Sequence, residues 1–288
     1  MANDKAKAVI WIASYPKSGN TWVQSVVRRA GIRYGFPKAD VDVYRLIAEK
    51  REPDVVNGIR PKVSSMATTV LKTHARHTPD QELHSQLRLK MAGFVHVRRN
   101  PLDVLLSYIN FTRVQYERRK DSTDYQDNLF LNLLGFDKAV PYEDWVNVKL
   151  EDIPRLNLDY ALRRFAELET AIPGMSMTGG SWMAHCKSWF EAGKTLPSVF
   201  FRYEDLLKGP EYFLPLNELF TFSSKEIVEA VNSINEGQKK LQYKKIFFNK
   251  MTSYYYQQFF SASAINEFLL RFEDDLKRLG YGDLPEYA

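Results

Sequence analysis

The chain has 288 residues, of which 44% are hydrophobic and 14% aromatic, so it can bury a sizeable core. No apolar run reaches the roughly 18 residues of a membrane-spanning helix, no apolar signal core precedes the first strand, and the single cysteine, Cys186, excludes an internal disulfide framework. The net charge of +5 suits an anionic ligand, and no basic run or nucleic-acid-binding signature accompanies it. We therefore expect a cytoplasmic protein without a membrane or nucleic-acid partner.

The first predicted element is a strand over residues 8–13, a short apolar run rich in Val, Ile and Trp. Tyr15-Pro16 ends regular structure, Gly19 lets the backbone turn, and helical periodicity begins at Thr21. A strand, a tight basic loop and a helix together present backbone N–H groups and a positive helix end to a phosphate or sulfate. The side chains expected to assist are those of Lys17, Ser18, Asn20 and Thr21.

Three further strands are predicted over residues 68–73, 93–98 and 199–203, and helical stretches separate them. One helix begins near Leu102 after Pro101, and another covers 180–192; residues 33–67 read as irregular connection and 79–91 as a polar helix or loop. This order predicts an α/β fold, a central parallel sheet flanked by helices, with ligands at the carboxyl ends of the strands. No repeat or linker divides the chain, so we expect one domain over residues 1–288.

The stretch S-Y-P-K-S-G-N-T-W, residues 14–22, resembles the 5′-phosphosulfate loop of cytosolic-type and bacterial-like sulfotransferases. These enzymes use 3′-phosphoadenosine 5′-phosphosulfate (PAPS) and release adenosine 3′,5′-bisphosphate. The resemblance implies transfer of a sulfuryl group to a hydroxyl or amine of a small-molecule acceptor, without a metal. It places Lys17 on the leaving oxygen, residues 18–21 including Gly19 around the 5′-phosphate, and Trp22 against the adenine. The nucleotide P-loop differs, since its Lys follows the second Gly.

The segment L-K-T-H, residues 71–74, resembles the part of that family that carries the general base. On this match His74 removes the acceptor proton, and Lys72 stabilises charge on the sulfuryl oxygens. Imidazole suits the task because it titrates near neutral pH. His77 stays open as a rival base, and a lone His after a strand is often only structural.

The stretch V-H-V-R-R-N-P-L-D-V-L-L-S-Y, residues 95–108, resembles the family's 3′-phosphate motif. Arg99 and Ser107 keep its spacing of eight residues, and Arg98 is the second candidate. An Arg suits the role because its planar fork meets phosphate oxygens in pairs. In F-F-R-Y-E-D, Tyr203 matches a residue near the adenine or the phosphate, and Ser233 weakly matches a residue that lines the nucleotide.

The C-terminal part departs from the family, which commonly has R-K-G and G-D-W segments that clamp the 3′-phosphate and adenine. Here F-F-N-K-M and Y-Y-Y-Q-Q-F-F-S stand in their places, and only Lys250 survives. Either the clamp is rebuilt from Lys244, Lys245 and Lys250, or the cosubstrate binds more weakly. The aromatic run 254–256 covers the site or belongs to the core.

The segment 110–180 is expected to be a variable insert that shapes the acceptor pocket. Residues 121–170 hold 11 acidic and 5 basic side chains, a net charge of −6. This charge indicates either a solvated acidic helix face or a pocket for a polar, cationic acceptor. The aromatic and apolar residues considered for that pocket are Tyr125, Phe130, Leu131, Phe136, Tyr142 and Trp145.

Two other functions stay open from the sequence. One is a P-loop kinase or NTPase that uses ATP and Mg²⁺, and the other is a non-catalytic module that binds anions or nucleic acid. The inverted loop argues against the first, and the second requires that His74 be dispensable. We expect no carboxylate or His/Cys metal-ligand cluster.

Overall fold

The computed structural model describes residues 7–31, 68–77, 89–117, 120–169, 172, 180–241, 253–282 and 284. Its strands are β1 (Lys7–Ser14), β2 (Thr68–Thr73), β3 (Leu89–Arg98) and β4 (Ser198–Arg202), and they form one parallel sheet in the order β2-β1-β3-β4. The predicted α/β fold with a central parallel sheet is therefore confirmed. Because β1 and β3 are the inner strands, the segments that follow them lie at the middle of the sheet edge.

Strand β3 is longer than the sequence pattern predicted. Met91 pairs with Val9 and Gly93 with Ile10, so Ala92 is an extra residue that breaks the ladder between β1 and β3. Such a bulge interrupts the alternation of side chains along the strand. For this reason the polar stretch that we expected to be a helix or loop up to residue 91 ends as strand from Leu89.

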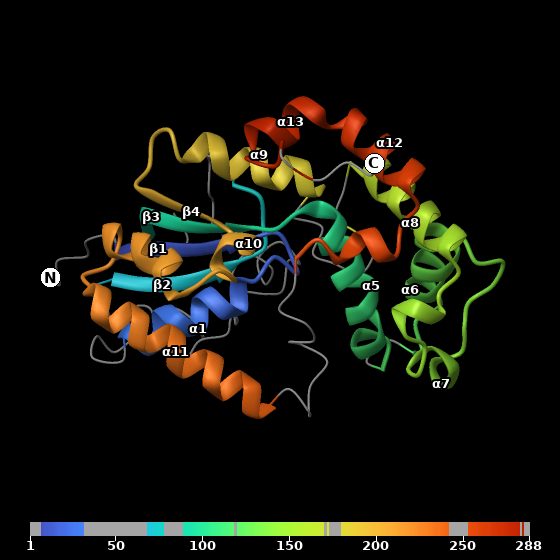
Figure 1. Cartoon of the computed structure of the whole chain (residues 1–288), viewed down its shortest axis with the longest axis horizontal. Helices are drawn as coiled ribbons and strands as arrows, with labels where there is room; N and C mark the ends of the chain where they lie inside the picture. Colours follow the sequence, from blue (N-terminus) through green and yellow to red (C-terminus); the bar gives the residue numbers. More distant parts are fainter. Residues whose placement is uncertain are drawn as a thin grey trace, which may run out of the picture.

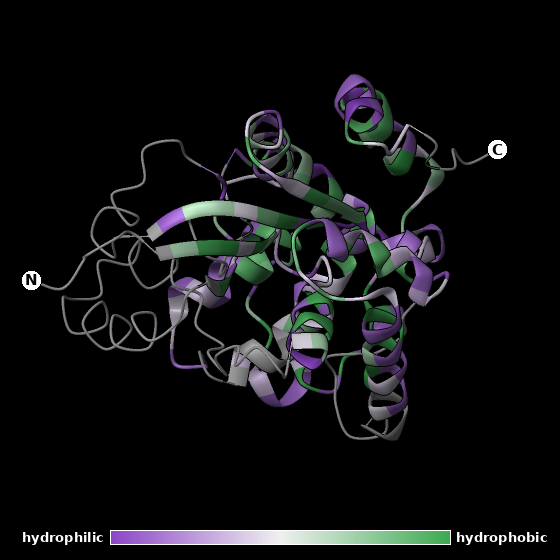
Figure 2. Cartoon of the chain, turned by 90° about the vertical axis from the view of Figure 1, so that its left-hand side faces the viewer, coloured by the Kyte–Doolittle hydropathy of each residue, from purple (hydrophilic) through white to green (hydrophobic). Residues whose placement is uncertain are grey.

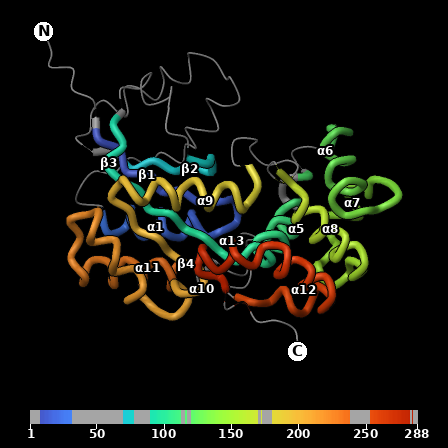
Figure 3. Tube along the Cα trace, turned by 90° about the horizontal axis from the view of Figure 1, so that it is seen from above, coloured from blue at the N-terminus to red at the C-terminus, as the bar shows by residue number. Residues whose placement is uncertain are grey.

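Helices cover both faces of the sheet, as Figures 1 and 3 show. One face carries α1 (Asn20–Ala30), α11 (Ser224–Leu241) and the 3₁₀ segment η5 (Pro210–Glu218), and the other carries α9 (Trp182–Ala192) and α13 (Glu273–Arg278). The strands are mostly apolar along their length in Figure 2. Their buried side chains, among them Ile12, Val95 and Val97, form one core with the apolar face of α1.

A helical half lies beside the carboxyl edge of the sheet (Figure 1). Its elements are α5 (Pro101–Glu117), α6 (Thr123–Asp127), the π-helical η2 (Asn128–Leu133), α7 (Tyr142–Trp145), η3 (Leu150–Asp152), α8 (Arg155–Glu167), η7 (Tyr255–Gln258) and α12 (Ala262–Arg271). The short α10 (Tyr203–Leu206) follows β4 directly. A second hydrophobic core unites this half, with Phe130, Trp145, Tyr256 and Phe268 among its buried members. Among the described residues, no helix combines the length and hydropathy needed to cross a membrane.

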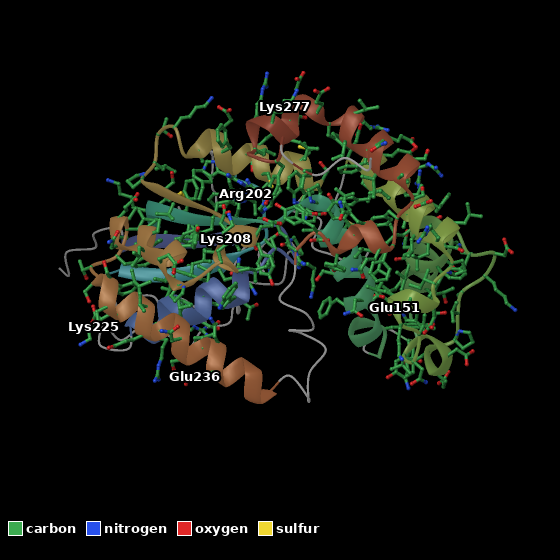
Figure 4. All side chains as sticks on the ribbon, in the orientation of Figure 1. Glu151, Arg202, Lys208, Lys225, Glu236 and Lys277 are labelled. Carbon is green, nitrogen blue, oxygen red and sulfur yellow. The ribbon has the colours of Figure 1, made fainter. Side chains whose placement is uncertain are left out.

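The segment 121–169 separates its charges from its aromatic side chains. Tyr125, Phe130 and Trp145 are buried in the core of the helical half, where the Phe130 and Trp145 rings are 5.0 Å apart. Nine of the acidic residues are exposed, among them Glu151, which Figure 4 labels in this half of the molecule. The buried exception, Asp159, accepts a hydrogen bond from the Ser261 N–H at 2.9 Å and so joins α8 to α12. This arrangement favours the solvated acidic face.

Candidate active site

The loop between β1 and α1 depends on a glycine at position 19. Gly19 has φ of 102°, a left-handed conformation that side chains disfavour. A Cβ atom at this position would lie 2.6 Å from Cδ2 of Tyr203. The loop backbone and the Tyr203 ring can approach one another only because Gly19 has no side chain. Lys17 is also left-handed, with φ of 71°, so its backbone is held in an uncommon conformation.

The polar side chains of the loop have different roles. Asn20 Nδ2 donates to the carbonyls of Ile12 at 3.0 Å and Thr73 at 3.3 Å, so this side chain ties the loop to β1 and β2. Its predicted contact with an anion therefore falls to the backbone N–H. Ser18 Oγ is buried and has no hydrogen-bond partner among the described residues, whereas Thr21 is exposed. A buried hydroxyl without a partner is costly, which indicates a ligand atom at this place.

Lys17 lies at the centre of a group of cations. Its Nζ is 3.9 Å from the centre of the Phe111 ring on α5. Burial, with added repulsion from Arg99 and Lys72, lowers the pKa of Lys17 to about 7. The charges of Arg99, after β3, and Lys72, on β2, thus both act on Lys17 after β1, and an anion bound beside Lys17 would relieve that repulsion.

Arg99 is buried and its guanidinium lies between tyrosines. Its Cζ is 4.5 Å from the centre of the Tyr203 ring and 5.7 Å from that of Tyr255. The centres of the Trp22 and Tyr203 rings are 5.9 Å apart. The predicted residues Trp22, Tyr203 and Arg99 therefore form one contiguous cluster next to Gly19.

The neighbouring Arg98 has different surroundings. Its charge acts on His96, Cys186 and Tyr281, and its Cζ is 5.9 Å from the centre of the Phe200 ring. Successive side chains along a strand point to opposite faces, which separates the two arginines. The structure therefore favours Arg99 over Arg98 as the residue beside the loop.

His74 follows β2 and is fastened to β1. Its Nδ1 lies 2.8 Å from the carbonyl oxygen of Ser14 and 3.3 Å from the Ser14 hydroxyl. Because the carbonyl can only accept, Nδ1 carries the proton, and Nε2 is then the basic nitrogen. His77 instead packs its ring against Trp189 at 5.2 Å, and its backbone N–H donates to Ser188 Oγ. Burial lowers the pKa of His77. His77 is thus attached to α9 rather than to the loop.

Three predicted residues are less closely tied to this group. Ser107 is half-buried on α5 and lies four residues before Phe111, so both share the face of the helix that meets Lys17. Ser233 lies half-buried on α11, the helix that packs along α1 (Figure 1). Lys250 lies outside the described residues, as do Lys244 and Lys245.

The structure adds a buried polar network that the sequence reasoning missed. Asn100 Oδ1 accepts from the Asp103 N–H at 2.8 Å, and Asn100 Nδ2 donates to Asp103 Oδ2 at 2.8 Å. Glu204 accepts from the Asn100 N–H at 2.8 Å and from the Tyr281 hydroxyl at 3.1 Å. The first pair is the reciprocal cap that starts α5, and the spacing in N-P-L-D was a signal for it. The contact with Glu204 had no local signal.

A second missed group corrects the expectation that no His/Cys cluster exists. His96 on β3 and His185 and Cys186 on α9 bring their ligand-type atoms within 4.8 Å of one another, all buried. His96 Nε2 and His185 Nδ1 are 3.5 Å apart. Burial lowers the pKa of both imidazoles, that of His185 to about 3, and raises the pKa of the thiol to about 12. His185 and Cys186 are neighbours in the chain, but His96 lies 89 residues before His185, so no spacing rule joins all three.

Comparisons with known proteins agree with this geometry. The family model of the sulfotransferase domain matches residues 7–275. Sulfotransferase 1A1 of Rattus norvegicus is 25% identical over 247 residues, which are 84% of this chain and 68% of that protein. Sulfotransferase 1E1 of Homo sapiens is 26% identical over 198 residues, 68% of this chain and 52% of that protein. The aligned part thus spans between half and about two thirds of these relatives.

One solved structure shares the fold. The crystal structure of mouse sulfotransferase SULT7A1 complexed with PAP covers 96% of this chain and 90% of its own, with a TM-score of 0.53 and 16% identity. At this identity the likeness concerns the fold alone. The family match, however, extends over most of the chain and includes all four strands and the loop, so this protein belongs to the sulfotransferase-domain family.

Proposed function

We propose that this protein transfers a sulfuryl group from PAPS to a hydroxyl or amine of a small-molecule acceptor. The observation that carries the proposal is the meeting of Lys17, Lys72 and Arg99 at a left-handed loop, with the imidazole of His74 at the neighbouring strand end. PAPS supplies the activated sulfuryl group and leaves as adenosine 3′,5′-bisphosphate. Membership of the sulfotransferase-domain family supports the reaction type.

The loop residues would bind and orient the anionic end of the cosubstrate. The N–H groups of Asn20 and Thr21 come before the first hydrogen bonds of α1, which Trp22 and Val23 make to Gly19. Ser18 Oγ has no partner among the described residues, so it and these two N–H groups can donate to phosphate or sulfuryl oxygens. Lys17, protonated on contact with the anion, would hold negative charge on the leaving oxygen. Such preorganised donors stabilise developing charge in the transition state.

His74 would remove the proton of the attacking group. The bond from Nδ1 to the Ser14 carbonyl keeps the ring in one orientation and leaves Nε2 as the base. Lys72, on the same strand, would stabilise charge on the sulfuryl oxygens. Arg99, Tyr203 and Trp22 would hold the nucleotide, with Arg99 on the 3′-phosphate and Ser107 beside it. Ser233 and Lys250 stay proposals without a described contact to the loop.

The acceptor remains the least defined part of the proposal. We assign the segment 110–180 to the acceptor side of one domain because it begins within α5 and includes Phe111, whose ring contacts Lys17. The outward position of its acidic residues weakens the case for a cationic acceptor, and that idea stays a prediction. The cytoplasmic location expected from the sequence also stays a prediction.

A comparison of ligands tests the reaction type against the kinase or NTPase alternative, which the family match does not support. Adenosine 3′,5′-bisphosphate at about 100 times its dissociation constant should stabilise the protein by roughly 2.7 kcal/mol. ATP with Mg²⁺ should stabilise it less at the same concentration. Thermal unfolding measures both stabilisations, and the formation of sulfated product from PAPS and a panel of acceptors then measures turnover. Stabilisation by ATP with Mg²⁺ alone would point to the alternative.

A further inference from the structure

The C-terminal turn of residues 253–258 lies where the family's clamp segments are absent, and it is fastened to the start of α5. The buried carboxylate of Asp103 accepts the Tyr254 N–H at 2.8 Å through Oδ2 and the Tyr256 N–H at 3.1 Å through Oδ1. Tyr254 has φ of 61°, which is uncommon for a side chain of this size. One carboxylate thus holds this unfavourable backbone conformation through two hydrogen bonds, one on each side of Tyr255.

The middle residue of this turn reaches Arg99. The Tyr255 hydroxyl donates to the Asp103 carbonyl at 3.3 Å and hydrogen-bonds with the Arg99 side chain, and its ring centre is 5.7 Å from Arg99 Cζ. Tyr203 lies 4.5 Å from the same guanidinium carbon. Arg99 Nη2 is also 3.9 Å from Asp103 Oδ2, so the carboxylate faces Arg99 as well as the turn.

A further contact joins the turn to the sheet. Arg202 Nη2, at the end of β4, donates to the Tyr254 hydroxyl at 3.3 Å. Figure 4 shows Arg202 near the middle of the molecule, between the sheet and the C-terminal helices. The turn is therefore held from α5 and from β4, and its aromatic rings do more than fill a core. The Arg99 guanidinium, held by tyrosine rings and hydrogen bonds, has little rotamer freedom left to lose when it binds a phosphate.

We propose that the turn 253–258 substitutes for the missing clamp, with Asp103 fastening the turn and Tyr255 orienting Arg99 toward the 3′-phosphate. This inference rests on the proposed function, because it assigns a place to the 3′-phosphate of the same nucleotide. Asp103 acts through the turn and is a positioning residue. Tyr255 determines how strongly the protein distinguishes nucleotides with a 3′-phosphate from those without one.

The test compares adenosine 3′,5′-bisphosphate with adenosine 5′-monophosphate, which lacks the 3′-phosphate, by calorimetric titration of the full chain. The quantity measured is the dissociation constant of the monophosphate divided by that of the bisphosphate, which is large when the 3′-phosphate strengthens binding. We expect Tyr255→Leu to lower this ratio about tenfold and Tyr255→Phe about threefold, with monophosphate affinity within about twofold of wild type. Tyr212→Leu, on the exposed surface of η5, is the matched control and should leave the ratio unchanged.

Asp103→Asn should lower the same ratio, because an amide cannot accept both N–H groups of the turn as well. In the double variant with Tyr255→Leu, Asp103→Asn should lower the ratio little further, since both substitutions disrupt the same positioning of Arg99. Should Asp103→Asn fail to fold, Tyr255→Phe still decides the matter, since it removes one hydroxyl. A wild-type ratio retained in both Tyr255 variants would overturn this inference and leave the proposed function standing. A wild-type ratio near one would overturn both.

Discussion

The sheet half and the helical half of the molecule differ in how far their decisive contacts reach along the chain. In the sheet half, Lys17, His74 and Arg99 each follow a strand closely, and the parallel order of the strands brings them together. In the helical half, Asp103 bonds to a residue 151 positions away and Asp159 to one 102 positions away. Short motifs thus mark the proposed catalytic edge, whereas contacts between distant residues hold the helical half together.

The largest expected effect lies in the sheet half, at the general base. His74→Ala should reduce turnover by roughly 10²–10⁴ and leave nucleotide affinity near wild type, because the imidazole acts on the acceptor proton. Steady-state kinetics with PAPS and calorimetry with adenosine 3′,5′-bisphosphate measure the two quantities. His77→Ala is the control, since its ring packs against Trp189. If the His77 variant were the inactive one, the roles assigned here would be reversed.

The next effect tests the helical half through its core. Trp145→Ala removes a ring that is 1% exposed and donates to Thr112 Oγ1, and should lower the free energy of unfolding by about 3–5 kcal/mol. Nucleotide affinity measured well below the melting temperature should stay unchanged. Leu156→Ala, on a side chain 76% exposed, should shift stability by about 0.5 kcal/mol or less. A strong loss of nucleotide affinity in the Trp145 variant would show that the core of the helical half also supports nucleotide binding.

The third expected effect is a loss of turnover on substitution of Lys17. Lys17→Ala should lower turnover about 10²–10³ fold because it removes one preorganised charge from the leaving oxygen. Single-turnover measurements at saturating PAPS isolate this step from binding. Thr21→Ala, at an exposed residue in the first turn of α1, should lower turnover far less. Equal losses in the two variants would mean that Lys17 contributes no more than the loop as a whole.

Substitutions at two glycines test how strongly the loop depends on a left-handed residue. Gly19→Ala should lower stability by about 1–3 kcal/mol, since a left-handed residue would gain a Cβ at 2.6 Å from the Tyr203 ring. Gly237→Ala, on α11 with nothing within 4 Å of the new Cβ, should instead raise stability by about 0.5–1 kcal/mol. Denaturant unfolding compares them. A neutral Gly19 variant would show that the loop can relax.

The last expected effect concerns pH. The pKa of Lys17 is lowered from 10.5 to about 7 in the folded protein, so between these values the unfolded chain binds the extra proton. The free energy of unfolding should therefore rise with pH in this window, by up to about 1.4 kcal/mol per unit and less because Lys17 is half-buried. Affinity for adenosine 3′,5′-bisphosphate should fall over the same range. Lys17→Met should remove both slopes, and persistence of either would assign it to another group.

The sequence by itself determined the parallel sheet, the left-handed loop proposed to bind the anion, and the strand-end positions of Lys17, His74 and Arg99. These features are readable because they depend on short-range rules: apolar runs for buried strands, a glycine where the backbone must be left-handed, and a basic residue before a helix. The start of α5 was equally readable, because Pro101 predicted a helix from about Leu102.

Only the tertiary structure decided which neighbouring residues face the site and what closes it. It separated Arg98 from Arg99, committed the Asn20 amide to the carbonyls of β1 and β2, and placed Tyr255 over Arg99. Most of these contacts join residues that are far apart in the sequence. Leaving a buried polar group without a hydrogen bond costs free energy, so packing favours the arrangement that pairs it, and a short sequence motif does not reveal which distant residue provides that pair.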